Sequence, residues 1–79
     1  MLLSADQRRA LAMLSTAGQD GTAQALLSAH GLDATMIAGL VSRGLATLTM
    51  EKVRASGKLI AVATVRITEA GRRALAAED

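Results

Sequence analysis

The hydrophobic pattern of the chain changes period once, at Leu45, and this change limits the fold more than any other feature. Before Leu45 the apolar residues recur at the spacing of helices, and from there to Ile67 they alternate as in strands. The sequence therefore predicts an α+β domain with a three-helix core and a two-stranded hairpin. The expected elements are helices at about 4–17, 22–29 and 33–43, strands at about 45–54 and 58–67, and a short C-terminal helix at about 68–77.

Polar residues mark the expected start of each helix. Ser4 and Gln7 have the spacing of a capping box, in which each side chain bonds the backbone amide of the other residue. Thr22, Asp33 and Thr68 stand at the corresponding position of the later helices. The inner face of the second helix is expected to consist of Ala25, Leu26 and Ala29.

The chain of 79 residues is expected to form a single domain over residues 1–79, because the length leaves no room for two. Hydrophobic residues make up 51% of it, but none is aromatic, so aliphatic side chains and methionine must fill the core. Aromatic side chains bury the most area per residue. A core of this size without aromatic residues is expected to be only marginally stable, so stabilisation by a partner stays an open alternative.

The chain has no cysteine, which excludes disulfides and thiolate metal sites but gives no indication of the redox compartment. The apolar run at its start is too short for a signal peptide or a membrane span. We therefore expect a cytoplasmic protein that has no contact with a membrane.

Positive charge is concentrated in the second half of the chain. Residues 1–42 carry a net charge of −1, whereas residues 43–77 carry +5. Such asymmetry favours an anionic partner. The cations of the second half are Arg43, Lys52, Arg54, Lys58, Arg66, Arg72 and Arg73.

Three segments carry a resemblance to a known family. They are AQALLSAHGLDATMIAGLVS (Ala23–Ser42), SRGLATL (Ser42–Leu48) and VRITEAGRRAL (Val65–Leu75). Together with the order of three helices, a hairpin and a helix, they resemble the winged helix-turn-helix DNA-binding domains, particularly the MarR-like branch, in a minimal version. Two positions depart from the family's pattern: Leu27 stands where a small residue is usual, and His30 where an apolar one is usual.

The resemblance implies that the third helix lies in the major groove of duplex DNA. On that helix Thr35, Ser42 and Arg43 would contact base edges or phosphates. Gly39 lowers helix stability by about 1 kcal/mol relative to alanine, which suggests close approach of a backbone, a phosphate or a partner helix. The alternative is tight packing of Gly39 against the second helix.

The resemblance also implies that the hairpin is a wing whose tip follows the DNA backbone. Lys52, Arg54 and Lys58 cluster near this tip, and Arg66 lies further along the second strand. The alternative is that these cations keep an exposed hairpin soluble and prevent pairing at its edges. Arg72 and Arg73 are interpreted as solvated residues of the last helix.

Ile60 and Val62 suggest an interface. Both lie on the face of their strand opposite to Val65 and Ile67, so both faces of the strand are apolar near its tip. A symmetric homodimer would cover them. The alternative is that the C-terminal helix folds back over them.

Catalytic chemistry is not expected. His30 is the sole histidine and has no cysteine or carboxylate pair beside it, so no metal site is predicted. There is no nucleophile–base–acid set and no phosphate-binding loop, so we expect no enzyme activity and no cofactor. The leading hypothesis is a small dimeric DNA-binding protein that regulates transcription. The alternative is a winged-helix module for protein interaction or dimerisation that has no specific DNA binding.

Overall fold

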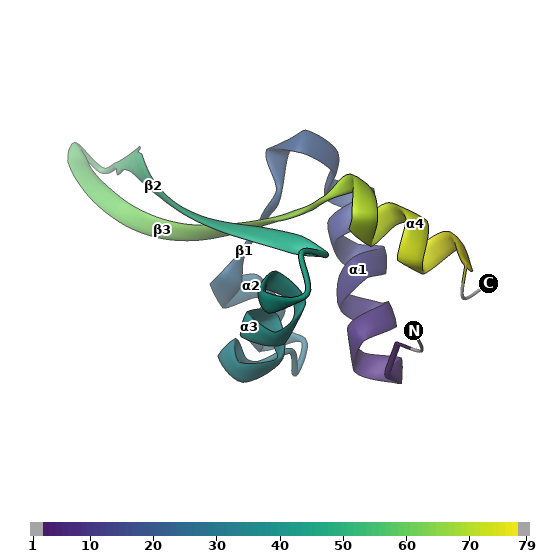
Figure 1. Cartoon of the computed structure of the whole chain (residues 1–79). Coiled ribbons are helices and arrows are strands. Elements are labelled where there is room, and N and C mark those ends of the chain that lie inside the picture. Colours follow the sequence, from purple (N-terminus) through teal and green to yellow (C-terminus); the bar gives the residue numbers. More distant parts are fainter. Residues whose placement is uncertain (1–2, 78–79) are drawn as a thin grey trace.

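Figure 1 shows a computed structural model of the chain, in which residues 3–77 are described. It is an α+β structure with a three-stranded antiparallel sheet of strand order β1-β3-β2. The first half contains α1 (Ala5–Ala17), a 3₁₀ turn η1 (Gly18–Asp20), β1 (Thr22–Ala23), α2 (Gln24–Ala29) and α3 (Ala34–Ser42). The second half contains β2 (Ala46–Ala55), β3 (Lys58–Ile67) and α4 (Glu69–Ala77).

The α+β prediction is confirmed, and α1, α3, α4 and both hairpin strands lie within one residue of their expected bounds. The layout is compatible with a winged-helix arrangement. The predicted domain of residues 1–79 extends at both ends beyond the described residues.

The expected second helix, 22–29, is wrong at its start, and the sheet has three strands rather than two. Thr22 and Ala23 are extended and pair with Val65 and Thr64 of β3. Because the backbone of Thr22 belongs to this strand, Thr22 does not cap a helix, and α2 begins at Gln24 without a side-chain cap.

The buried face of α2 also differs from the prediction. Leu27 is fully buried, whereas the expected inner residues Ala25, Leu26 and Ala29 are exposed. The helix has only six residues, so its apolar residues do not define a face by spacing alone. Leu27 is the buried residue of this helix.

The other expected caps are present. Ser4 Oγ accepts from the backbone N–H of Gln7 at 3.1 Å, and the Gln7 side chain accepts from the Ser4 N–H at 2.9 Å. The Asp33 carboxylate accepts from the N–H of Met36 at 2.9 Å. These bonds satisfy amides that would otherwise have no partner in the first turn of each helix.

The core lies between the helices and the inner end of the hairpin. It is aliphatic, as expected, and its largest fully buried side chains are Leu11, Leu14, Leu27, Leu32, Ile37, Leu40 and Val65. Of the hairpin, Ala46, Thr64, Val65 and Ile67 are buried. The outer part of the hairpin therefore lies outside the core.

The hairpin extends well beyond the helices (Figure 1), and the overall dimensions of 44 × 22 × 20 Å reflect this projection. Its strands are joined by Ser56 and Gly57, which have φ angles of 53° and 78°. Two consecutive residues with positive φ are typical of the tight turn whose twist matches that of the strands. The turn therefore permits pairing up to Ala55 and Lys58.

The C-terminal helix α4 begins at a close contact with the loop before β2. Thr68 Oγ1 accepts from the N–H of Gly71 at 3.0 Å and donates to the carbonyl of Gly44 at 2.6 Å. A methyl group added at Gly71 would collide with the carbonyl oxygen of Leu45. Glycine is therefore required for α4 to approach this closely.

Helix α4 packs against α1, at the end of the molecule away from the hairpin tip (Figure 1). It leaves Ile60 exposed. The alternative to a dimer, in which the C-terminal helix folds back over Ile60 and Val62, is therefore wrong. Among residues 3–77, no helix has the length and hydropathy needed to cross a membrane.

Candidate nucleic-acid interface

The outward side of α3 consists of short side chains. Ala34, Thr35, Ala38 and Ser42 are exposed, whereas Ile37 and Leu40 on the opposite side are buried. Arg43 follows as the C-terminal cap residue and is also exposed. The three residues predicted to contact DNA from this helix therefore lie at its accessible surface, Thr35 in the first turn and Ser42 and Arg43 at the end.

Gly39 has open space where a side chain would stand. It is half-buried, but a β-carbon added to it would meet no atom within 4 Å. Tight packing against the second helix is thus not the reason for this glycine. The expectation of a close approach by a partner stays a prediction.

The register of the hairpin divides the three predicted wing cations between its two faces. Lys52 lies opposite Ala61 and Arg54 opposite Leu59, on the face that continues outward from Leu48. Lys58 lies opposite Ala55 on the other face. Lys52 and Arg54 therefore share the face of the ribbon that packs against the helices at its inner end, and Lys58 lies across the ribbon from them.

A groove of about 380 Å³ lies between α3 and β2 on this face. Its polar lining residues are Gln24 and Ser42, and the remainder are apolar. The full lining is Gln24, Ala34, Ile37, Ala38, Val41, Ser42 and Leu48. Because Ala34, Ala38 and Ser42 belong to the outward side of α3, the groove adjoins the surface that the predicted DNA contacts occupy.

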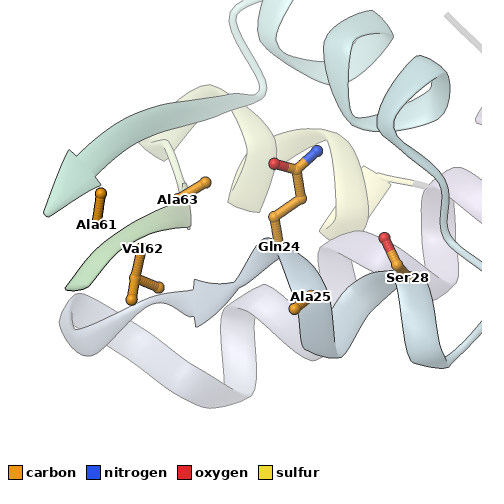
Figure 2. Close-up of a pocket in the computed structure, with 6 residues that line it drawn as sticks. All are labelled: Gln24, Ala25, Ser28, Ala61, Val62 and Ala63. Carbon is orange, nitrogen blue, oxygen red and sulfur yellow. The ribbon is translucent and has the colours of Figure 1, made fainter. Parts of the chain in front are cut away.

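A second hollow of about 390 Å³ separates the start of α2 from the middle of β3 (Figure 2). Figure 2 shows Gln24, Ala25 and Ser28 on α2 and three residues of β3 around it, namely Ala61, Val62 and Ala63. Gln24 borders both spaces. Sequence reasoning did not identify it, because a glutamine on a six-residue helix carries no periodic signal.

Between residues 34 and 68 the chain has five cations and one carboxylate, Glu51. Glu51 lies opposite Val62, on the face of the hairpin away from Lys52 and Arg54. A hydrogen bond with Thr64, which has the larger effect, and a hydrogen bond with Arg66 hold the pKa of Glu51 below its usual value. The negative charge is thus turned away from α3 and neutralised on its own side of the sheet.

Arg66 is a structural residue rather than a member of the wing surface. Its Nε donates to the carbonyl of Gln19 at 2.8 Å, and its two terminal nitrogens donate to Thr49 Oγ1 and to both carboxylate oxygens of Glu51, each at 3.1 Å. It thereby fastens the η1 turn to the hairpin. Gly21 accommodates this arrangement, because an added β-carbon would lie 2.8 Å from Arg66 Cγ.

The predicted interface residues Ile60 and Val62 lie on the same face of the hairpin as Glu51. Ile60 is half-exposed opposite Val53, which is exposed to the same degree of 48%. Val62 is less exposed and also borders the hollow beside α2. The exposed apolar pair on this face is therefore Val53 and Ile60.

His30 caps the end of α2 and is exposed, and its carbonyl accepts from Arg9 at 3.4 Å. Within residues 3–77, no three histidine, cysteine or carboxylate side chains are grouped as they would be around a metal ion.

Comparison of the chain with family models, curated proteins and solved structures finds no match.

Proposed function

We propose that this chain is a minimal winged-helix domain that binds duplex DNA and regulates transcription. The observation that carries the proposal is the charge distribution around α3 and the hairpin. Five cations accompany one carboxylate in residues 34–68, and that carboxylate, Glu51, is bonded by Arg66 on the far face of the sheet. A surface of this kind favours a polyanion.

Each part of the surface has a distinct role in this proposal. Helix α3 enters the major groove, which admits an α-helix, and Thr35, Ser42 and Arg43 contact bases or phosphates there. Lys52 and Arg54 contact the DNA backbone along the face of the hairpin that carries Leu48. Lys58 contacts phosphates from beside the turn. Contacts of this kind release counterions and so give affinity that depends on salt.

A second copy of the chain completes the proposed functional unit. Val53 and Ile60 are large apolar residues that are half-exposed on one face of a projecting hairpin, and Val62 continues that face. Burial of such residues between two copies would add apolar contact to a core without aromatic residues. A symmetric pair is the commonest form of such an assembly.

The exposed apolar residues also favour a second function, a protein-interaction module on the same scaffold. Among residues 3–77, the large exposed apolar residues are Leu26, Leu48, Met50, Val53, Leu59 and Ile60. Leu48, Met50 and Leu59 lie on one face of the hairpin, and Val53 and Ile60 lie on the other. Exposed apolar residues grouped in this way are typical of a binding surface. In this alternative the groove beside α3 and the outer hairpin contact another protein, and DNA is not a ligand.

Titration of a fluorescently labelled duplex with the chain separates the two functions. DNA binding predicts a rise in anisotropy at about 50 mM salt that weakens strongly at about 200 mM, because phosphate contacts are sensitive to salt. The interaction module predicts no change at either concentration. Absence of binding at low salt would therefore exclude the DNA-binding proposal.

A further inference from the structure

The groove between α3 and β2 has a lining that is unusual for a DNA-facing surface. Its inner wall is aliphatic, with Ile37 almost fully buried and Leu48 half-exposed. Ala34 and Ala38 add methyl groups from the outward side of α3. The groove therefore offers van der Waals contact to a ligand and few hydrogen bonds.

Hydrogen-bonding readout of bases is correspondingly poor on this helix. Arginine, lysine, asparagine and glutamine make the bidentate contacts that identify guanine and adenine. None of these four residue types occurs between Ala34 and Ser42. The apolar part of the lining suits another feature of the major groove, the 5-methyl group of thymine, which is read by apolar contact with side chains such as alanine and threonine.

The charge around the groove is consistent with such a ligand. Arg43 lies at the end of α3, and Lys52 lies further along the face of β2 that carries Leu48. The carboxylate of Glu51 lies on the opposite face and is bonded by Arg66. An occupant that has an apolar group flanked by negative charges fits this arrangement, whereas an acidic side chain on the same face would have repelled it.

We infer that the groove between α3 and β2 takes the thymine methyl groups of a DNA major groove, and that the chain prefers DNA rich in such methyls. This inference rests on the proposed DNA-binding function. The short side chains of Ala34, Thr35 and Ala38 allow the helix backbone to come close to the base edges. Thr35 adds a γ-methyl group and a hydroxyl at the start of the same surface.

Four duplexes of equal length test the inference by fluorescence anisotropy at low salt. They contain alternating dA–dT, alternating dA–dU, alternating dG–dC, and dG–dC with 5-methylcytosine. Uracil removes only the methyl from thymine, and 5-methylcytosine adds a methyl at the corresponding edge of a G·C pair. The dA–dT and methylated duplexes are expected to bind more tightly than their unmethylated partners, by a factor of about four for each methyl that the groove buries.

Two matched variants locate the effect. Leu48 and Leu26 are 45% and 51% exposed, but of the two only Leu48 lines the groove. Leu48→Ala is expected to shrink the preference for thymine over uracil, and Leu26→Ala to leave it unchanged. Equal affinity of the unaltered chain for the dA–dT and dA–dU duplexes would overturn the inference and leave DNA binding in place. Failure to bind any of the four duplexes would overturn DNA binding itself.

Discussion

Arg66 donates to both carboxylate oxygens of Glu51 at 3.1 Å, although the two residues lie on different strands and are not direct partners in the register. The same guanidinium donates to Gln19 at 2.8 Å. A single side chain thus connects the outer hairpin, the inner hairpin and the turn after α1. This connection holds the base of the projecting hairpin against the helical part of the molecule.

The first prediction concerns the pH dependence of this connection. Hydrogen bonds with Thr64 and Arg66 lower the pKa of Glu51 from its ordinary value of 4.5. The native protein therefore binds fewer protons than the unfolded chain in this range, and the resulting stability is complete above pH 4.5 and is lost as the pH falls through the native pKa. The stability difference between the unaltered chain and Glu51→Gln should shrink on acidification.

Urea denaturation at a series of pH values below and above 4.5 measures this difference. Glu69→Gln, which removes an exposed carboxylate of α4 that lies 3.7 Å from Arg73, controls for the loss of one negative charge elsewhere. A stability difference that stayed constant across the whole pH range would contradict the role assigned to Glu51.

The second prediction compares two helix glycines. Gly71→Ala should destabilise the chain by about 2 kcal/mol, because the new methyl collides with the carbonyl oxygen of Leu45 and backbone cannot move away as a flexible side chain can. Gly39→Ala should stabilise it by about 1 kcal/mol, because the added methyl meets no atom and alanine favours the helix. Thermal or urea unfolding measures both, and equal effects of the same sign would show that the packing of α4 is described wrongly.

Much of the fold could be predicted because its signals are local. The change of period at Leu45 separates helices from strands, and Ser4, Asp33 and Thr68 each act within a single turn. The strand β1 could not be predicted in the same way. It has only two residues, and its pairing depends on Val65 and Thr64, which are more than forty positions away.

The candidate site could be predicted only in part for the same reason. The sequence places Lys52, Arg54 and Lys58 near the tip of one hairpin, but only the register of the strands shows that Lys58 lies on the other face from Lys52 and Arg54. Whether a cationic side chain bonds other residues of the fold or stays available to a partner depends on residues that are distant in sequence. Arg66, for example, donates to Gln19, which is 47 positions away. The groove beside α3 likewise forms from three separate elements, which no local pattern indicates.

The third prediction concerns self-association. Ile60→Asp should convert the proposed dimer to a monomer, because it places a charge in the apolar face that the second copy covers. Leu26→Asp is the matched control, since Leu26 is 51% exposed and Ile60 is 48% exposed, but Leu26 lies on α2. Sedimentation equilibrium measures the mass of each. A monomeric unaltered chain at high concentration would rule out the homodimer.

The most direct test of the central claim is the dependence of duplex affinity on salt. Phosphate contacts by Arg43, Lys52, Arg54 and Lys58 predict a slope of about −3.6 for log K against log salt concentration. The double variant Lys52→Gln with Arg54→Gln should reduce the slope to about −1.8, because each lost contact removes about 0.9. The corresponding change of Arg72 and Arg73 on α4 should leave it unaltered. A slope near zero for the unaltered chain, or equal slopes for both double variants, would contradict DNA binding by α3 and the hairpin.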